Sequence, residues 1–596
     1  MEATLDQTYK IRHSLAHVMA QAVQQHYPDV QLGFGPPTDD GFYYDFDFGD
    51  VKLEEKDLKK IEKSMKKIIG QKQSFQRIEL SKEEALKRAD EEKQNYKTLQ
   101  IENLESKGIH EYSYYENGPF SDLCEGPHVE HTGELPAKAF KVSHIAGAYW
   151  MGSEKNKMLT RIYAFAFETA EELQDYLAKR KLAEERDHKK LGKELDIFMI
   201  SNTVGKGLPL WLPNGCIIRD CIEDYAKDME FKYGYKRVAT PHITKSDLYY
   251  RSQHLPAYKE SMFPPMTLEE EADDGVTVVK EEYYLKPMNC PHHHMIFGNS
   301  PVSYKQLPMR LAEYGHCYRF EKSGELSGLL RVRSLCMNDA HIYLAVDQVR
   351  EEFKRTMQMY QEFYTTFKLD SYSYRLSVRS PEKSEKYQGD AEMWEKAEKM
   401  LAEVLDELEI PYEVGEGEAA FYGPKLDIQF KNLIGREETV STIQLDFLGP
   451  VNFDLKYTGA DGEEHRPVII HRAPLSTHER FISFLIEYYG GAFPTWCSPV
   501  QVAMIPVRDE IVDYAKSIEE KLFGQKVRVE IDDSNNSLNK KVRNAVTRKI
   551  PNILILGDQE KDDQTVTWRK YGQKEQQTMS LDEFEKTLKD IIENKL

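Results

Sequence analysis

One polar stretch of helix-forming residues divides this chain and limits how it can fold. It runs from residue 168 to 198 and reads "ETAEELQDYLAKRKLAEERDHKKLGKELDIF". A helix with so few apolar positions has no continuous face to bury in a core, which is typical of a helix that links domains. The chain has 596 residues, enough for roughly four domains of about 150 residues each. The sequence therefore predicts separate domains on either side of this stretch.

The patterns on either side of the linker predict a multidomain α+β protein. Residues 1–180 mix helical and strand patterns, and residues 181–196 form the linker helix proper. Residues 197–496 are rich in short apolar runs, and within them "MTLEEEADDGVTVVKEEYYLKP" is predicted to be an exposed hairpin. Residues 497–596 alternate strands with helices, which indicates a small α/β domain on a mostly parallel sheet.

Composition excludes several classes of protein. Hydrophobic residues make up 40% of the chain and aromatic residues 11%, which is enough for globular cores. No apolar run approaches the roughly 20 residues of a membrane span, and the N-terminus lacks the apolar core of a signal peptide. Seven scattered cysteines fit reduced thiols, and a net charge of −20 argues against a general nucleic-acid coat. We expect a cytoplasmic protein.

The stretch "RVRSLCMNDAHIY", residues 331–343, has the pattern of a strand with an unusual face. Because side chains alternate along a strand, its odd positions share one side. That side carries two guanidinium groups at one end, then Leu335 and Met337, then Asp339 and His341. At about 3.3 Å per residue, the last two lie roughly 7 Å apart along the strand, close enough for one small ligand to contact both.

The segment "YRFE" just before it is predicted to be the partner strand of a hairpin. Arg319 and Glu321 share one face of that strand, and the loop "KSGELSGL" joins the two limbs. Arg319 and Arg331 then stand on opposite limbs, where two guanidinium groups can clamp a polyphosphate. A plain structural pairing of arginine with glutamate is the alternative interpretation.

These residues resemble motif 2 of the class II aminoacyl-tRNA synthetases. "LPNGCIIRDCIEDYAKDMEFKYGYKRVATPHI" resembles motif 1, a long helix and a strand ending at Pro241, which builds the dimer interface in that family. "VIIHRAPLSTHERFISFLIEYYGG" resembles motif 3, in which Arg480 matches the arginine that lies against ATP. The stretches "KPMNCP", "NDAHIY", "AFYGPKLDIQF", "TIQLDF" and "HRA" are similar to the threonyl-tRNA synthetase family in particular.

The resemblance implies an antiparallel-sheet class II catalytic domain at 197–496, with an α+β editing domain before it and an α/β anticodon-binding domain after it. It also implies a homodimeric ligase that uses ATP and Mg²⁺ to attach threonine to its tRNA. The residues matched to catalysis or ATP binding are Arg319, Glu321, Arg331, Gln444, Thr477 and Arg480. Those matched to threonine binding are Asp339, Tyr422, Lys425 and Gln444. His254 matches a histidine near the tRNA 3′ end.

Cys290, His341 and His471 match the zinc ligands of that family. They are separated by about 50 and 130 residues, so spacing alone would not reveal a site. From the residues alone, Cys290 is equally compatible with a small buried hydrophobe, and each histidine with a hydrogen-bonded core residue. The run of three histidines at 292–294 looks more like a metal site, yet the resemblance assigns it no ligand.

Three protein ligands leave one or two positions on zinc open, and the amino and hydroxyl groups of threonine can fill them. A hydrophobic pocket separates valine from threonine by only roughly 1–3 kcal/mol, whereas a metal that requires an oxygen ligand rejects valine. Serine carries both groups and is accepted by the metal. Discrimination against serine must therefore come from elsewhere.

A second cluster of possible metal ligands lies near the N-terminus. His13 and His17 are four residues apart in "HSLAH", on one face of a predicted helix, and "SDLCEGPHVEH" adds Cys124 and His128. Their composition fits a closed zinc site, and scattered surface residues are the plain alternative. By resemblance, the cluster matches the editing domain of the bacterial-type enzymes, which hydrolyses seryl-tRNA, in general without metal. The implied editing residues are His13, His17, Lys97, Asp122, Cys124 and His128.

The segment after residue 497 resembles the anticodon-binding domain of several class II enzymes. Asn535, Glu560 and Arg569 match positions that read anticodon bases. Asparagine and arginine suit base edges, and glutamate can accept a hydrogen bond from an amino group. A basic run nearby comprises Lys540, Lys541, Arg543, Arg548 and Lys549. It either contacts the phosphates of a bound nucleic acid or is a solvated helix face.

The sequence departs from the usual family pattern at four places. It begins at the editing region, where many bacterial relatives first carry a ubiquitin-like TGS domain, and we expect catalysis not to need that domain. Leu335 stands in place of a phenylalanine that stacks on adenine. Met337 replaces a glutamine, and Ser476 replaces a glycine near ATP.

Two other functions remain open from the residues alone. One is a different class II synthetase, such as a prolyl or seryl enzyme, although these lack a zinc triad joined to an editing cluster. The other is a synthetase-like RNA-binding regulator without adenylation activity. The intact set of Arg319, Glu321 and Arg480 argues against that regulator.

Overall fold

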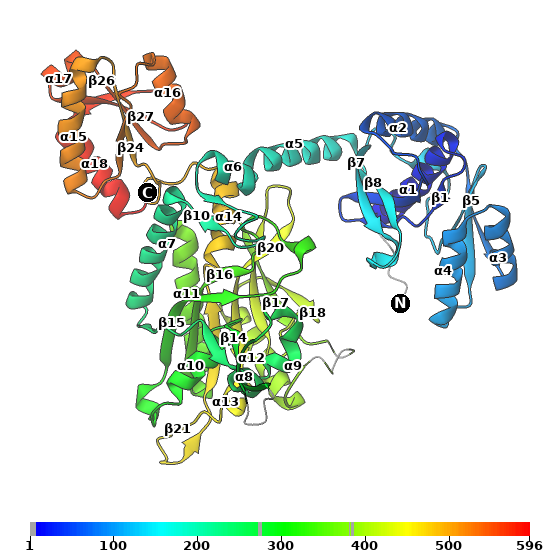
Figure 1. The fold of residues 1–596 in the computed structure, drawn as a ribbon, viewed down its shortest axis with the longest axis horizontal. Helices are drawn as coiled ribbons and strands as arrows, with labels where there is room; N and C mark the ends of the chain where they lie inside the picture. Colours follow the sequence, from blue (N-terminus) through cyan, green and yellow to red (C-terminus); the bar gives the residue numbers. More distant parts are fainter. Residues whose placement is uncertain (1–6, 272–276, 381, 383–384, 386) are drawn as a thin grey trace. The chain divides into compact units, whose positions relative to one another are not determined.

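The computed structural model describes residues 7–271, 277–380, 382, 385 and 387–596. The chain divides into two compact units, residues 1–181 and residues 182–596 (Figure 1). No helix among the described residues is both long enough and apolar enough to cross a membrane. Each unit has its own hydrophobic core, so each is described separately.

The first unit packs two helices on an antiparallel sheet. Apolar side chains of α1 (Gln7–His26) and α2 (Glu55–Gly70) meet the inner face of that sheet. Helix α1 ends at His26, two residues before Pro28, which cannot continue a helix. The sheet has the order β1-β3-β8-β7, with β2 paired to β3. Its strands are β1 (Gln31–Leu32), β2 (Pro37–Thr38), β3 (Gly41–Asp47), β7 (Phe140–Tyr149) and β8 (Met158–Ala166).

A smaller three-stranded sheet in the same unit carries two further helices. Buried residues of both helices pack against β5 and β6 in a satellite core. The elements are β4 (Phe75–Leu80), α3 (Lys82–Glu91), α4 (Asn95–Ser106), β5 (Tyr112–Asn117) and β6 (Phe120–Leu123). This subdomain supplies α4 and the chain after β6 to the site described below.

The stretch predicted to form one linker helix forms two helices. Helix α5 (Ala170–Arg186) is mostly exposed, and α6 (His188–Glu194) follows after a break at Asp187. The Asp187 carboxylate accepts hydrogen bonds from the backbone N–H groups of Lys189 and Lys190 at 2.7 and 3.3 Å, which starts a new helix. His188 is buried, and its ring contacts Glu487 of the second unit's helix α14 (His478–Tyr489) at 2.7 Å. The prediction of one continuous linker helix rested on the many polar residues of this stretch. It missed the Asp187 cap and the buried side chains that hold α6 in place.

An eight-stranded sheet forms the centre of the second unit. Its order is β11-β15-β16-β23-β20-β19-β17-β18, with antiparallel pairing except at the two edge pairs. The antiparallel central sheet that was expected is confirmed. The strands are β11 (Lys236–Arg237), β15 (Met309–Tyr318), β16 (Ser334–Leu344), β17 (Tyr372–Val378), β18 (Tyr412–Glu416), β19 (Lys425–Lys431), β20 (Glu437–Asp446) and β23 (Val468–Ala473).

Helices pack their apolar faces on this sheet and complete the main core. Besides α14, these are α7 (Pro213–Lys232), α11 (Val349–Thr366) and α12 (Ala391–Glu407). The long helix predicted for motif 1 is α7. The strand predicted after it is short, because β11 covers only two residues and ends before Pro241.

The hairpin predicted around residues 319–343 exists, but both of its limbs are shorter than predicted. Strands β15 and β16 are antiparallel, with Tyr318 opposite Ser334. The prediction that the strands include Arg319, Glu321 and the Arg331–Arg333 segment is wrong, because these residues lie beyond the ladder. There the Arg333 backbone N–H donates to Gly207 O at 2.6 Å, and the Arg333 side chain donates to Glu321 O.

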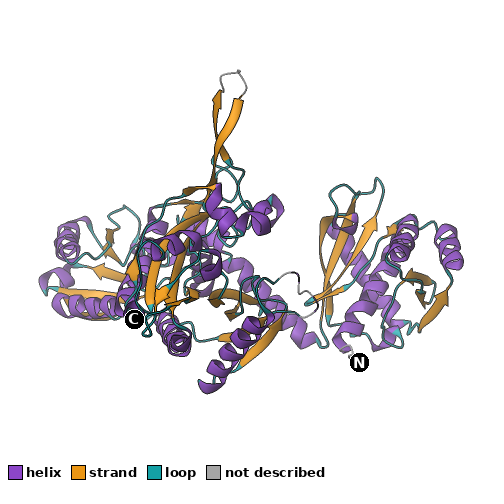
Figure 2. Cartoon of the chain, turned by 90° about the horizontal axis from the view of Figure 1, so that it is seen from below, coloured by secondary structure: helices purple, strands orange, loops and turns teal. Residues whose placement is uncertain are grey.

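A hairpin projects from the second unit (Figure 2). It consists of β13 (Met266–Glu271) and β14 (Thr277–Leu285), and β12 (Ile243–Lys245) also pairs with β14. The exposed hairpin predicted here is therefore present, and its turn at 272–276 lies outside the described residues. The smaller elements nearby are β9 (Phe198–Met199), β10 (Leu210–Trp211), α8 (Ser246–Arg251), α9 (His254–Tyr258), α10 (Cys290–Phe297), α13 (Gly449–Asn452), β21 (Tyr457–Thr458) and β22 (Glu464–His465).

The C-terminal segment alternates strands and helices as predicted. Its sheet has the order β25-β24-β26-β27-β28, and only the pairings of β24 with β25 and β26 are parallel. The expectation of a mostly parallel sheet is therefore half right, since short connections before β27 and β28 return the chain antiparallel. The elements are β24 (Val502–Pro506), α15 (Val512–Gly524), β25 (Val529–Ile531), α16 (Leu538–Thr547), β26 (Asn552–Leu556), α17 (Asp558–Asp562), β27 (Thr565–Lys570), β28 (Gln577–Ser580) and α18 (Leu581–Glu593).

Candidate active sites

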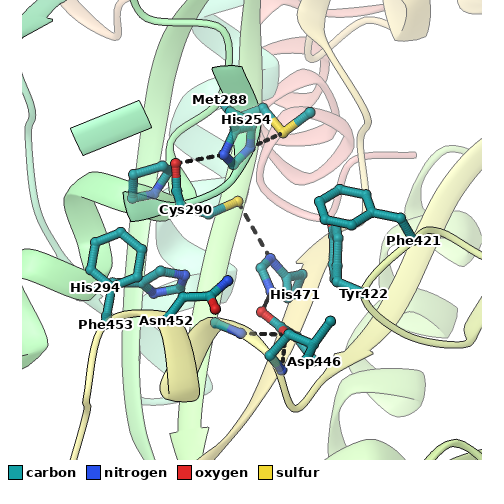
Figure 3. A pocket seen from close by; sticks show the side chains of 14 residues that line it. His254, Met288, Cys290, His294, Phe421, Tyr422, Asp446, Asn452, Phe453 and His471 are labelled. Carbon is teal, nitrogen blue, oxygen red and sulfur yellow. Dashed lines mark hydrogen bonds and ion pairs between the residues drawn. The ribbon is translucent and has the colours of Figure 1, made fainter. Parts of the chain in front are cut away.

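Three side chains from distant parts of the sequence meet beside the central sheet. Cys290 begins α10, whereas His341 and His471 lie opposite each other on β16 and β23. One ligand atom from each lies within 4.8 Å of the other two, and Cys290 Sγ is 3.5 Å from His471 Nδ1 (Figure 3). The structure thus brings the three predicted ligands together.

The donor atoms of this triad are free to bind a cation. His471 Nε2 donates to Asp446 Oδ2 at 2.9 Å, which leaves Nδ1 facing Cys290. His341 Nε2 is buried and has no hydrogen-bond partner. Burial, helped by neighbouring His471, lowers the pKa of His341 well below its ordinary value, so this ring is neutral near pH 7. Imidazole nitrogens and a thiol are the ligands that zinc prefers, so these residues fit that metal.

The charges around the triad favour a bound cation. Burial, together with Asp339 and Asp446, raises the pKa of the Cys290 thiol well above its ordinary value. Burial alone would raise the pKa of Asp446, but the hydrogen bond and charge of His471 hold it below its ordinary value. A cation placed here would offset both carboxylates and favour the thiolate.

A cavity of about 320 Å³ opens beside the triad. In the sheet, His341 lies opposite His471, His471 opposite Gln444, and Gln444 opposite Lys425, so one row of side chains crosses four strands. The Tyr422 hydroxyl donates to Gln444 Oε1 at 3.0 Å. The predicted residues that line this cavity are Arg319, Asp339, Tyr422, Lys425, Gln444 and Arg480.

The cavity combines groups that suit an amino acid joined to a phosphate. Asp339 is buried, and Asn289 Nδ2 donates to it at 3.1 Å. Burial raises the pKa of Asp339, although the nearby imidazoles oppose that shift. An ammonium group can pair with this carboxylate, while the guanidinium groups of Arg319 and Arg480 can pair with phosphate oxygens. One ligand can therefore contact a carboxylate, a metal and two guanidinium groups.

Three of the predicted ATP-binding residues do not line the cavity. Arg331 is 48% exposed and pairs with Glu321 at 2.8 Å and with Glu325 at 2.8 Å. Of the two arginines predicted to form a clamp, only Arg319 lines the cavity. The Thr477 hydroxyl caps α14 by accepting from the Arg480 backbone N–H at 3.1 Å.

The positions that depart from the family pattern differ in their surroundings. Leu335 is buried against Cys317 and Val332, whereas Met337 and Ser476 line the cavity. Ser476 has φ = 51°, in the left-handed region that favours glycine. That backbone conformation explains why a glycine is usual at this position.

His254 lies in a separate, smaller cavity of about 30 Å³ (Figure 3). His254 Nδ1 is 2.8 Å from Ser252 Oγ, and Nε2 is 3.1 Å from Met288 Sδ. Burial lowers the pKa of His254 to about 4. Cys290 and His471 border both cavities, so the cavity that contains His254 also reaches the triad.

The N-terminal cluster also assembles. His13 and His17 lie one turn apart on α1, and Cys124 and His128 follow β6. Cys124 Sγ is 3.2 Å from His13 Nε2 and 3.3 Å from His128 Nε2, and one donor atom of each of the four residues lies within 4.8 Å of the others. Burial lowers the pKa of His13, His17 and His128 and raises that of Cys124 to about 12. The four groups are therefore neutral near pH 7.

Lys97 and Asp122 form a buried ion pair beside this cluster. Their side chains are 3% exposed, and Lys97 Nζ is 2.5 Å from Asp122 Oδ1. The Tyr44 hydroxyl also donates to Asp122. A cavity of about 260 Å³ is lined by His13, His17, Tyr44, Asp122 and Cys124 among others. Asp47 does not line this cavity, and it accepts from Tyr96 at 2.8 Å and from Lys157 at 2.6 Å.

The three residues matched to anticodon reading do not all meet. Asn535 and Glu560 follow β25 and β26, whose carboxyl ends share one edge of the sheet because both strands run parallel to β24. Arg569 pairs with Ile553 near the amino end of β26, away from that edge. Glu560 already accepts from the Gly557 N–H and the Thr567 hydroxyl, both at 2.8 Å.

The basic run on and after α16 is partly used inside the protein. Lys541 is buried and donates to Pro506 O at 3.3 Å, and Arg548 pairs with Glu530 at 2.7 Å. Lys540 and Arg543 are exposed. The run is therefore neither wholly a solvated face nor wholly available for phosphates.

Sequence reasoning missed two residues that hold side chains at the Cys290–His341–His471 triad and its cavity. Asp446 orients His471, and Asn289 holds Asp339. Strand alternation could have found Asp446, because it stands two residues after Gln444 on the same face of β20. No comparable signal marks Asn289, which precedes α10 in a loop.

Three known families match successive parts of this chain. The "Threonyl and Alanyl tRNA synthetase second additional domain" matches residues 113–163, and the "tRNA synthetase class II core domain (G, H, P, S and T)" matches residues 276–489. The "Anticodon binding domain" matches residues 501–591. These matches follow the same order as the expected domains.

Known proteins resemble the chain over nearly its whole length. A threonine–tRNA ligase of Geobacillus sp. (strain WCH70) is 50% identical over 581 residues, which is 97% of this chain and 88% of the relative. One of Staphylococcus carnosus (strain TM300) is 50% identical over 584 residues, which is 98% of this chain and 88% of the relative. A crystal structure of the RNA binding domain of threonyl-tRNA synthetase from Cryptosporidium parvum Iowa II has a TM-score of 0.62 and 34% identity, covering 68% of this chain and 98% of its own.

Proposed function

This chain belongs to the threonine–tRNA ligase family, and we propose that Cys290, His341 and His471 hold a zinc ion through which it selects threonine. The enzyme activates threonine with ATP, used with Mg²⁺, and transfers threonine to its tRNA. Its editing domain serves to hydrolyse mischarged seryl-tRNA. One observation carries the zinc proposal: His341 Nε2 is buried without a partner beside two other zinc-type ligands.

The triad and the editing cluster divide the work of selection. When bound, zinc supplies Lewis-acid positions for the amino and hydroxyl groups of threonine. Valine lacks the hydroxyl group and is rejected, but serine has both groups and passes. Discrimination against serine therefore belongs to the cluster around Cys124 in the other unit.

The groups lining the larger cavity perform the activation step. Arg319 and Arg480 stabilise phosphate charge as the threonine carboxylate attacks the α-phosphate of ATP and pyrophosphate leaves, and Asp339 pairs with the ammonium group. The part of the cavity assigned to threonine is lined by Tyr422, Lys425 and Gln444. The remaining ATP residues act by support: Glu321 fixes Arg331, and Thr477 starts the helix that carries Arg480.

Editing is assigned to the N-terminal cavity. His13, His17, Cys124 and His128 are neutral groups that can position a water molecule and the tRNA 3′ end. Asp122 lines this cavity and forms a buried ion pair with Lys97 behind it. His254, near the synthetic triad, is assigned to the tRNA 3′ end during aminoacylation.

The domain limits proposed are 1–180 for editing, 181–196 for the linker, 197–496 for catalysis and 497–596 for anticodon binding. The family matches at 113–163, 276–489 and 501–591 fall within these limits. Asn535, Glu560 and Arg569 are the proposed anticodon readers. The proposed compartment is the cytoplasm, where translation uses tRNA and ATP.

A homodimer is proposed from exposed apolar residues around motif 1. Phe231, near the end of α7, is 86% exposed. Met199 and Leu210 pair across β9 and β10, and both are exposed. These exposed apolar residues lie at the two ends of α7, and exposed apolar surface is typical of a protein–protein interface. Sedimentation of the wild type and of Phe231→Glu tests this, since only the wild type should be dimeric.

Amino-acid-dependent exchange of pyrophosphate into ATP tests the synthetic function. Threonine should support exchange, and valine should not. Exchange with proline in place of threonine would overturn the specificity, and no exchange with any amino acid would overturn the enzymatic function. Metal analysis of the same preparation should find one zinc ion per chain; an active enzyme without zinc would refute the role of the triad.

A further inference from the structure

His293, the middle member of the run of three histidines, contacts a proposed zinc ligand. His293 Nδ1 is 2.8 Å from His341 Nδ1, and His293 Nε2 is 3.1 Å from Glu313 Oε2. His293 and His341 are fully buried, and Glu313 is almost fully buried. A hydrogen-bonded chain therefore runs from Glu313 through His293 to the ring of His341.

The partners of Glu313 fix the direction of this chain. Its carboxylate accepts from the Thr240 backbone N–H at 2.7 Å and from the Thr240 hydroxyl at 2.9 Å, and Lys286 Nζ lies 3.6 Å away. With these donors around it, Glu313 can only accept a further hydrogen bond. In its neutral form, His293 then donates from Nε2, and its Nδ1 carries the lone pair.

The same logic settles which nitrogen of His341 carries the proton. Because His293 Nδ1 accepts, His341 donates from its own Nδ1. In a neutral imidazole only one nitrogen is protonated, so His341 Nε2 keeps its lone pair. That atom is the buried one that has no hydrogen-bond partner.

We propose that His293 and Glu313 are positioning residues that fix the tautomer and ring orientation of His341, so that its Nε2 lone pair faces the metal. This inference rests on the proposed zinc site. Each of the two proposed histidine ligands would then have a carboxylate that orients it. Asp446 contacts His471 directly, and Glu313 acts on His341 through His293. Such outer partners orient a ligand and raise its basicity.

The neighbouring histidines provide an internal comparison. His292 Nε2 is 2.8 Å from Thr244 Oγ1, and His294 Nδ1 is 2.9 Å from Tyr343 OH. His292 is buried like His293 and follows Cys290 on the same helix, but its hydrogen bond leads away from the triad. His292 is therefore a matched control for His293.

Zinc affinity of the full-length protein tests the proposal, measured by competition with a chromophoric chelator. His293→Phe keeps a ring but removes both nitrogens, and should weaken zinc binding by roughly 10–100-fold, the usual effect of losing an outer partner. His293→Gln can still donate to Glu313 and accept from His341, and should bind zinc more tightly than His293→Phe. His292→Phe should bind zinc as the wild type does.

Two further readouts separate positioning from damage to the fold. Excess zinc should restore threonine-dependent pyrophosphate exchange in His293→Phe but not in Cys290→Ser, which lacks a ligand. The visible spectrum of the cobalt-substituted enzyme should change in His293→Phe and not in His292→Phe. Equal zinc affinities of the wild type and His293→Phe, or equal losses in both phenylalanine variants, would overturn the proposal. A wild type that binds no zinc would instead overturn the proposed zinc site itself.

Discussion

The two histidine–cysteine clusters contain the same kinds of group, but different neighbours hold their rings. In the synthetic triad, the Asp446 carboxylate lies 2.9 Å from His471. In the editing cluster, the Asp122 carboxylate pairs with Lys97 at 2.5 Å and lies 3.9 Å from His17. There a neutral hydroxyl, Ser14 Oγ, is 3.1 Å from the His128 ring.

This difference teaches that ligand types alone do not define a metal site. A carboxylate behind an imidazole raises its basicity and favours metal binding. The editing cluster has a carboxylate close by, but a lysine already neutralises it. With no free carboxylate behind their rings, the four groups of the N-terminal cluster are less suited to holding a cation than the triad. The predictions below test this contrast, from the largest expected effect to the smallest.

Replacing a ligand of the triad should have the largest effect. Cys290→Ser should remove zinc and threonine activation together, by more than the roughly 10–100-fold expected for an outer partner. Hydrolysis of seryl-tRNA should be unchanged, because Cys290 belongs to the other unit. Metal analysis, threonine-dependent pyrophosphate exchange and hydrolysis of seryl-tRNA, all measured on one preparation, test this prediction. Retained zinc with lost activation would mean that the thiol is not a ligand.

Breaking the buried ion pair of the editing unit should come next. Lys97→Met leaves Asp122 buried without its cation and should cost roughly 3–5 kcal/mol of unfolding free energy. The matched control is Lys157→Met in the same unit, since Lys157 pairs with Asp47 but is 60% exposed. That change should cost less than about 1 kcal/mol. Denaturant unfolding measures both, and equal losses would contradict the contrast.

Removing one histidine of the editing cluster should affect one activity only. His13→Ala should slow hydrolysis of seryl-tRNA by roughly 100-fold or more, the usual contribution of a group that handles protons. Threonylation should continue, so seryl-tRNA accumulates. Deacylation assays with purified seryl-tRNA measure this, and an unchanged rate would refute the assignment of this site.

Each site also has one residue whose backbone is left-handed, and the two residues differ. Gly126, after Cys124, has φ = 80°, and an added Cβ would meet the Tyr115 hydroxyl at 2.3 Å. Gly126→Ala should therefore cost roughly 1–3 kcal/mol and slow editing. Ser476→Gly should change stability by less than about 1 kcal/mol, because relief of strain offsets the entropy of glycine. Unfolding curves of both variants, with the two activity assays, test this pair.

The pH dependence of stability should differ slightly between the wild type and His13→Ala. Burial lowers the pKa of His13, so below the unfolded-state pKa of about 6.5 the unfolded chain binds more protons. The contribution of His13 to the free energy of unfolding is therefore complete above about pH 6.5 and is lost as the pH falls. Between about pH 7.5 and 5.5, the variant should lose up to about 1 kcal/mol less than the wild type. Identical slopes would show that His13 is not buried as a neutral group.

Local pattern was enough to predict the elements that are strongly periodic. The predicted helix that carries His13 and His17, the exposed hairpin and the alternation of strands and helices after residue 497 are all present. The break at Asp187 and the early ends of β15 and β16 were missed. They depend on partners far away in the sequence, such as Glu487 for α6 and Gly207 for Arg333.

The sites could be predicted only in part, and mainly through resemblance. Spacing could not bring Cys290 to His471, because cross-strand register decides which residues meet. Nor could a run of three histidines indicate which one faces the triad, since helix geometry turns each side chain toward a different neighbour. Of the orienting carboxylates, strand alternation could have found Asp446, whereas Glu313 reaches the triad only through His293.

The row from His341 to Lys425 has a consequence for how the enzyme matures. If β23 slipped by one residue against β16, Ile470 or Arg472 would take the place of His471, and every side chain of the strand would change face. A chain paired in that way would offer no complete ligand set. Binding of a metal by all three residues would therefore require the native alignment of α10, β16 and β23.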